Sequence, residues 1–190
     1  DVKAWGNIDH SADDGIIERL IIPAARARAE RFLNRRLVRQ TVTVTYDAPG
    51  DSLGILTLPV APVAYVDDIT YLDASGDRHT LEAAQYRVDV ENEPARLWPL
   101  SGWPPIGRQL AALTVAVAVG YEPAADESSG SPTVFDYRAN IPADITMGIL
   151  LDCLHLYEHR ATVSDLMGLT VTPHGWDALL FPHRVHGIGP

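Results

Sequence analysis

The hydrophobic period of this chain changes twice along the sequence, and this change constrains the fold more than any other feature. In residues 12–34 the apolar residues recur every three or four positions, which predicts an amphipathic helix. Between residues 41 and 119, short runs alternate apolar with polar residues, which predicts strands. The helical spacing returns in residues 145–157. We therefore expect an α+β fold in which a small α-helical bundle is interrupted by a β-rich antiparallel insertion.

The first long helix is expected to begin near Ala12, with Ser11 as its N-cap. Pro23 lies inside this helix and has no N–H to donate, so we expect a kink or a break there. Residues 1–5 are predicted to end an earlier helix that Gly6 closes. The two long helices are expected to pack against each other, because each carries an apolar face.

The insertion is predicted to contain short strands separated by turns rich in glycine, proline and aspartate. The expected strands cover residues 41–46, 54–58, 64–72, 79–81, 86–90, 95–98 and 110–119. Strands at this spacing predict an antiparallel meander or a small barrel. The acidic segment 122–132, which is rich in small residues, is the expected linker or loop.

The chain is therefore expected to have three parts. Residues 1–40 and 139–172 form the helical bundle, and residues 41–138 form the β-rich insertion. Residues 173–190 form an extended C-terminal tail, within which residues 177–181 are expected to make a single helical turn.

The charge of the chain is unevenly distributed. The 190 residues carry a net charge of −10, and residues 41–137 hold fourteen acids against four arginines. This balance argues against nucleic-acid binding through a basic face. Six arginines lie between residues 26 and 39, where they can contact acids or water. The apolar runs are too short to cross a bilayer and no signal-peptide pattern is present, so no membrane partner is expected.

One short motif has the spacing of a metal site. His155, Glu158 and His159 have the H-x-x-E-H spacing of one class of zinc proteases, in which two histidines one helical turn apart hold the metal. A catalytic zinc needs a third protein ligand. The downstream candidates for that ligand are Asp165, His174, Asp177, His183 and His186, and they form no second motif. A zinc-dependent hydrolase therefore stays as an alternative.

Other catalytic patterns are weaker. The sequence contains no G-x-S-x-G motif, and its single cysteine, Cys153, lies in an apolar helical pattern that predicts a buried, inert thiol. We assign no catalytic residue, no metal ligand and no cofactor, and we expect no enzymatic activity. A second alternative is that the chain is a soluble β-domain binding module.

Three segments resemble the head-to-tail connector, or adaptor, proteins of long-tailed phages and phage-like particles. Residues 2–41 are similar to the family's opening, where a helix end and an Ile-Asp turn precede a long helix and an Arg-Leu strand entry. Residues 86–99 resemble its Tyr-Arg-Val-Asp strand, Glu-Pro turn and Arg-Leu strand. Residues 141–163 resemble its last long helix, which proline opens and Tyr-Glu-x-Arg closes.

The resemblance implies a structural protein of the particle neck that is assembled in the cytoplasm of a bacterial host. Such subunits form a ring, dodecameric in the family, beneath the portal protein. The ring joins the DNA-filled capsid to a tail-side stopper or tail terminator protein. Double-stranded DNA would pass through the lumen without specific binding.

The resemblance also implies which residues contact partners. The C-terminal segment commonly binds the portal, and the matching candidates are Phe181, Pro182, His183, Arg184, Val185, His186 and Ile188. Deleting residues 182–190 should then abolish portal attachment. The expected intersubunit residues are Arg26, Arg28, Arg31, Arg35, Arg36, Glu158 and Arg160, with arginines facing acids of the next subunit or of the insertion.

Overall fold

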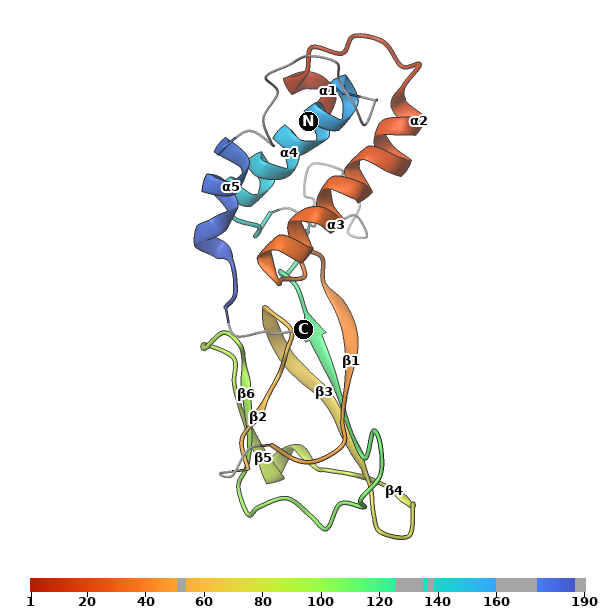
Figure 1. Ribbon diagram of the computed structural model, residues 1–190, viewed down its shortest axis with the longest axis vertical. Coiled ribbons are helices and arrows are strands. Elements are labelled where there is room, and N and C mark those ends of the chain that lie inside the picture. Colours follow the sequence, from red (N-terminus) through yellow and green to blue (C-terminus); the bar gives the residue numbers. More distant parts are fainter. Residues whose placement is uncertain (51–53, 126–134, 137–138, 160–173, 187–190) are drawn as a thin grey trace. The chain divides into compact units, whose positions relative to one another are not determined.

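The computed structural model describes residues 1–50, 54–125, 135–136, 139–159 and 174–186 (Figure 1). The chain divides into two compact units. The helical unit consists of Asp1–Leu33 and Ile141–Arg184, and the β unit consists of Asn34–Asn140 and Val185–Pro190.

The helical unit is built from segments at both ends of the sequence. Its elements are α1 (Val2–Trp5), α2 (Asp14–Ile16), the π-helical turn η1 (Ile17–Ile21), α3 (Ile22–Leu33), α4 (Ala143–Glu158), α5 (His174–Leu180) and the 3-10 turn η4 (Phe181–His183). Among the described residues, none of these helices has the length and apolar character that crossing a membrane requires.

The helix around Pro23 continues where the sequence predicted a kink or a break. Elements α2, η1 and α3 follow one another directly, and within η1 the N–H of Ile22 donates to the carbonyl of Ile17, five residues earlier. Pro23 has no N–H for the carbonyl of Arg19, so a regular α-helical bond is impossible there. A π turn is one of the known ways in which a helix accommodates such an interruption.

The predicted N-cap of this helix was wrong. The helix begins at Asp14, and its N-cap residue is Asp13, which makes no side-chain capping bond. Ser11 instead lies in the preceding turn, where its carbonyl accepts the N–H of Asp14. The carboxylate of Asp14 pairs with Lys3 at 2.8 Å, which ties the first turn to α1.

Gly6 closes α1 as the sequence predicted, but for a different reason. Its N–H donates to the carbonyl of Val2 at 2.9 Å, and its φ of −85° is accessible to any residue. A Cβ at Gly6 would lie 2.6 Å from the Cδ2 of Leu154 on α4. Close packing of α1 on α4, and not a left-handed backbone, is what requires glycine here.

The two long helices pack against each other, which confirms the prediction (Figure 1). Their shared core contains Ile17, Ile21 and Ala25 from the first helix and Cys153 from α4. Cys153 is fully buried, and this burial raises the pKa of its thiol to about 11. The thiol is therefore protonated and unreactive at neutral pH, as expected for a buried structural cysteine.

In the part of the chain that the structure describes, the β unit contains two antiparallel sheets and one further pair of short strands. The first sheet has the order β1 (Gln40–Tyr46), β7 (Leu113–Val119), β3 (Val63–Leu72) and β4 (Arg78–Thr80). The second has the order β2 (Leu56–Thr57), β6 (Arg96–Pro99) and β5 (Tyr86–Asp89), and η2 (Ala83–Gln85) precedes β5. Strands β8 (Ala124–Ala125) and β9 (Phe135–Asp136) form the further pair, which is antiparallel.

The predicted strands are present, but their order is neither a meander nor one closed barrel. Strand β7 lies between β1 and β3 (Figure 1), because its run of valine and alanine residues is buried almost throughout and a central position covers it. The two sheets share one core. Its fully buried members include Leu58 and Leu97 beside the second sheet and Ile69, Val115 and Val117 in the first.

Helix α5 is longer than the single turn predicted for the C-terminal tail. It covers His174–Leu180, and Trp176 and Leu180 are buried. A Cβ at Gly148 of α4 would lie 2.1 Å from the Cδ1 of Leu180, so the absence of a side chain at Gly148 creates the depression that Leu180 occupies. The first part of the segment expected to be extended is therefore helical.

The contact between Gly148 and Leu180 predicts opposite effects for two glycine substitutions. Gly148→Ala should destabilise the helical unit by about 1–3 kcal/mol, because Leu180 must move away from the new methyl group. Gly15→Ala is the matched control, since no atom lies within 4 Å of its added Cβ. It should stabilise the protein by about 0.5–1 kcal/mol through helix propensity. Urea unfolding of both variants measures the difference, and equal effects would contradict the assigned packing.

Candidate interaction surfaces

Trp176 fixes α5 to the rest of the helical unit. Its ring is buried and lies 4.9 Å from the ring of Phe32 on α3, tilted by 58°. The guanidinium carbon of Arg28 lies 4.7 Å from the centre of the Trp176 ring. This geometry combines an aromatic pair with a cation–π contact, each worth about 0.5–1.5 kcal/mol.

Arg28 also forms an ion pair with Asp152 of α4. Its Nη1 lies 2.7 Å from the Oδ1 of Asp152, which is buried. Burial raises the pKa of the Asp152 carboxyl, and the positive charge of Arg28 partly opposes this shift. Arg28 thus joins α3, α4 and α5 through one guanidinium group.

The residues after α5 differ in exposure. The Phe181 side chain is 56% exposed, and Pro182 and His186 are also exposed. His183 is partly buried, and its Nε2 lies 3.0 Å from the Oδ2 of Asp144. This hydrogen bond lowers the pKa of the Asp144 carboxyl. The guanidinium carbon of Arg184 lies 5.2 Å from the centre of the Phe32 ring.

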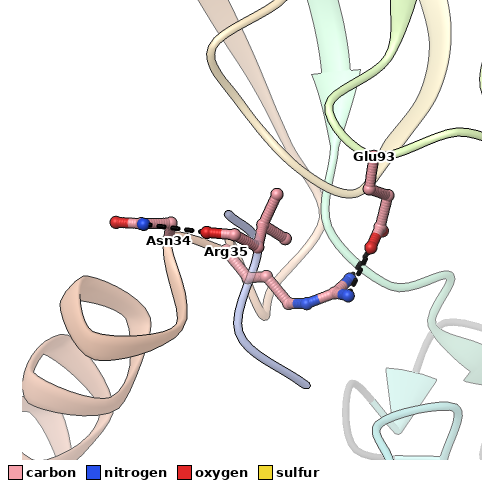
Figure 2. A network of polar contacts seen from close by, with 4 residues as sticks. Asn34, Arg35 and Glu93 are labelled. Atoms are coloured by element: carbon pink, nitrogen blue, oxygen red, sulfur yellow. Dashed lines mark hydrogen bonds and ion pairs between the residues drawn. The ribbon is translucent and has the colours of Figure 1, made fainter. Parts of the chain in front are cut away.

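Val185 is buried and belongs to the β unit. Its side chain is only 3% exposed, and its carbonyl accepts a hydrogen bond from the Nδ2 of Asn34 at 3.0 Å. Figure 2 shows Asn34, which adopts a left-handed φ of 53° directly after α3. Ile188 lies outside the described residues. Of the two large apolar candidates Phe181 and Val185, Phe181 therefore has the exposed side chain.

Two of the arginines expected between subunits have acidic partners in the same chain. Arg28 pairs with Asp152 as described above. Both terminal nitrogens of Arg35 contact the carboxylate of Glu93 in the insertion, with Nη1 at 2.6 Å from Oε1 (Figure 2). We expected acids of the insertion among the partners of these arginines, and Glu93 is such a partner of Arg35.

The other intersubunit candidates are placed as follows. Arg26, Arg31 and Arg36 are exposed, as is Glu158 at the end of α4. Arg160 lies outside the described residues. Their exposure makes the side chains of Arg26 and Arg31 accessible to another chain.

The zinc motif is only partly helical. Helix α4 ends at Glu158, and His159 is its C-cap residue with a φ of −108°. The rings of His155 and His159 lie 4.6 Å apart, and the Nδ1 of His159 is 3.2 Å from the carbonyl of His155. Within the part of the chain that the structure describes, no three His, Cys, Asp or Glu side chains are placed to hold a metal. These residues give the zinc alternative no support.

One surface feature of the β unit was not predicted as a site. An open hollow over the second sheet is lined by Ile55, Arg87, Val88, Asp89, Arg96 and Trp98. Trp98 is 60% exposed, and Arg87 and Asp89 pair across the strands with Trp98 and Arg96. Alternation in the two strands places these side chains on one face, but the register that aligns them is a tertiary property.

Comparison with known proteins identifies the fold. No protein-family model and no curated protein matches the sequence. Solved structures do match. A chain from the neck of an empty gene transfer agent (GTA) particle, computed with C6 symmetry, has a TM-score of 0.71 and 21% identity, covering 97% of this chain and 87% of that chain. A chain from the virion of a native GTA particle has a TM-score of 0.73 and 20% identity, covering 97% and 88%.

A third chain, from the neck of a native GTA particle computed with C12 symmetry, has a TM-score of 0.65 and 19% identity, covering 96% and 87%. The 190-residue chain therefore has the fold of a GTA particle protein. The helical and β units both take part in the match, because nearly the whole chain is covered. The shared fold agrees with the resemblance to head-to-tail connectors found in the sequence.

Replacing Trp176 should release α5 from this GTA-like fold. Trp176→Ala removes a buried ring and its contacts with Phe32 and Arg28, a change that typically costs about 3–5 kcal/mol. Hydrogen exchange should show that the amides of α5 lose protection while those of β7 keep theirs. Trp98→Ala is the control and should change stability by less than about 0.5 kcal/mol, because Trp98 is largely exposed. Unchanged protection of α5 in Trp176→Ala would refute the assigned role.

Asp152 and Asp144 should give pH dependences of opposite sign. Because the pKa of Asp152 is raised above its ordinary value of 3.8, the folded protein binds this proton more tightly than the unfolded chain. The stability of the wild type relative to Asp152→Asn should therefore fall as the pH rises from 3.8 through the raised pKa.

The pKa of Asp144 is lowered, so the stability of the wild type relative to Asp144→Asn should be lost as the pH falls from 3.8 through the lowered pKa. Urea unfolding of the three proteins between pH 3 and pH 7 measures both differences. If both stability differences changed with pH in the same direction, the raised pKa of Asp152 and the lowered pKa of Asp144 would be contradicted.

Proposed function

We propose that this chain is a structural head-to-tail connector subunit of a phage or gene transfer agent particle. Copies form a ring beneath the portal, join the DNA-filled capsid to the tail and continue the DNA channel. The observation that carries this proposal is the fold match over 97% of the chain with chains of GTA particles, including the neck computed with C6 symmetry. A neck computed with C12 symmetry contains a chain of the same fold, which supports a ring of identical subunits.

The proposed role is mechanical and needs no catalytic group. The match with particle proteins covers 97% of the chain and includes both of its units. In the described residues the strongest candidate motif, His155 to His159, is interrupted by the end of α4 and assembles no third ligand. We therefore propose a non-enzymatic protein without a cofactor.

Its proposed partners are the portal protein, a tail-side stopper or tail terminator, further copies of itself and the DNA that passes through. A dodecameric ring follows from the family resemblance. The acidic excess of residues 41–137 favours passage over binding, because a negatively charged channel wall repels the phosphate backbone. Location in the neck of a particle, with assembly in the bacterial host, follows from the same proposal.

The experiment that tests this function examines particles directly. Particles purified from the host should contain the chain, and electron microscopy with a tag on the chain should place it in a ring between capsid and tail. Mass spectrometry of the same preparation measures the number of copies relative to the portal protein. Finding the chain only outside the particles would refute the proposed function.

The portal contact is proposed to involve residues 181–186, with Phe181 as its apolar anchor. Deleting residues 182–190 is not a clean test, because the deletion also removes the buried Val185 and the bond between His183 and Asp144. A point variant at the exposed Phe181 leaves Val185 and the bond between His183 and Asp144 in place.

Phe181→Asp should weaken attachment to the portal at least about tenfold, since apolar anchors at interface centres contribute about 2 kcal/mol or more. The measurement is the amount of chain retained on tailless, portal-containing particles. Leu110→Asp is the matched control, because Leu110 is 82% exposed and belongs to no proposed contact. Equal retention of the Phe181 variant and the wild type would exclude Phe181 as an anchor.

A further inference from the structure

We propose that two free copies of this chain pair through the open edge of strand β1, as an antiparallel dimer with a two-fold axis at Thr43. The partner of β1 is β1 of the second copy. This contact differs from the one that closes a ring. A two-fold axis across the strands reverses one copy relative to the other, whereas the subunits of a cyclic ring all point the same way. The dimer is therefore a property of the chain outside the ring, and it does not depend on the connector function.

Strand β1 lies at the edge of its sheet along its whole length. Its seven residues pair with β7 in one continuous register, and in the part of the chain that the structure describes no strand pairs with its other side (Figure 1). An open edge of this kind is a template for a further strand, and proteins usually block it with charges, proline, a bulge or a short strand. Gln40–Tyr46 contains no charged residue and no proline. The edge of β1 is thus open to pairing.

The other edge strands of the two described sheets are protected. Strand β4, at the opposite edge of the first sheet, has three residues and carries Arg78 and His79. In the second sheet β2 has two residues, and β5 carries Arg87 and Asp89. Short length and charge both discourage the addition of a strand. Among these four edges, β1 is the one at which a further strand adds most readily.

Three threonines direct their backbone groups toward the open edge. At the two ends of β7 the even-numbered residues Ala112 and Gly120 form backbone hydrogen bonds on the β3 side. Because the direction of these groups alternates along a strand, the odd-numbered residues of β7 face β1. The register pairs them with even-numbered residues of β1. The N–H and carbonyl groups of Thr41, Thr43 and Thr45 therefore point away from β7.

The sequence of β1 is complementary to itself. Residues 41–45 read Thr-Val-Thr-Val-Thr, which is the same in both directions. In an antiparallel pair centred on Thr43, this residue lies opposite its own copy, and Thr41 lies opposite Thr45 of the second copy. The facing threonines exchange backbone hydrogen bonds in both directions, because their N–H and carbonyl groups point to the edge. Between them, valine lies opposite valine.

The side chains of β1 also suit a second copy of the same strand. Val42, Val44 and Tyr46 pack against the core of the β unit but are only partly buried. A second β1 places the same apolar side chains beside them, and the threonines of both copies lie together on the opposite face. Cross-strand pairs of β-branched residues stabilise an antiparallel sheet, and no like charges meet. The self-complementary alternation is what favours a second copy over an unrelated strand.

Disulfide cross-linking of the purified chain tests the position of the two-fold axis. Thr43→Cys should give a dimer on oxidation, seen in a denaturing, non-reducing gel. The two cysteines would lie opposite each other with Cα atoms about 5.5 Å apart, which a disulfide can bridge. The wild type is the control for Cys153, whose buried thiol should not react. A dimer band no stronger in Thr43→Cys than in the wild type would overturn the inference.

The two neighbouring threonines make the register specific. Thr41→Cys alone and Thr45→Cys alone should give few dimers, because each new cysteine lies opposite a threonine. A mixture of these two variants should give dimers, because the two cysteines then face each other. Abundant dimers from Thr41→Cys alone would show a parallel or shifted pairing and would refute the axis at Thr43. Circular dichroism checks that every variant is folded.

Sedimentation at rising concentration tests whether β1 holds the pair without a cross-link. The wild type should change from monomer to dimer only at high concentration, because a contact through one pair of strands is small. Thr43→Lys should stay monomeric where half of the wild type is dimeric, since the two-fold axis brings the two ammonium groups together.

Thr80→Lys is the matched control for this measurement. Thr80 is an exposed threonine of β4, at the opposite edge of the same sheet, so its variant should dimerise like the wild type. Two results would rule out the proposed dimer. One is a wild type that stays monomeric at every concentration, and the other is a Thr43→Lys variant that dimerises as readily as the wild type.

Discussion

The structure depends on the packing of two helices that are far apart in the sequence. The first helix ends at Leu33 and α4 begins at Ala143, yet Ile17, Ile21 and Ala25 share one core with Cys153. Formation of this core brings together the two ends of the intervening segment, and the entropic cost of closing so long a loop grows only slowly with its length. A large β insertion is therefore compatible with a stable helical unit.

The local pattern of the sequence predicted the elements well and their arrangement less well. The change of hydrophobic period identified both long helices and the main strands, because period is a local property. The central position of β7 depends on which strand is most completely buried, and pairing partners are not encoded locally. The prediction of Ser11 as the N-cap was wrong for a related reason. Ser11 has the right chemistry, but the chain turns once more and the helix begins at Asp14.

The candidate site was predictable as a segment and less so as individual residues. The resemblance to connectors selected residues 181–188, but only the structure separates the exposed Phe181 from the buried Val185. The arginine cluster was evident from composition, whereas the pairing of Arg28 with Asp152 and of Arg35 with Glu93 depends on tertiary packing. The helical spacing in residues 12–34 also did not separate the exposed Ile16 and Leu20 from the buried Ile17 and Ile21, because one helical period cannot distinguish two adjacent stripes.

The layered contacts of Phe32 and Trp176 have a mechanical consequence. The guanidinium group of Arg184 lies over the Phe32 ring and that of Arg28 over the Trp176 ring, so the backbone leaving α5 is anchored to α3 within a few residues. A pull on the chain end acts first on Val185, which is buried and bonded to Asn34, and then on this stack. The Trp176 ring must then leave Arg28 and Phe32 before tension can unwind α4, which makes the stack a mechanical clamp at the root of the C-terminal segment.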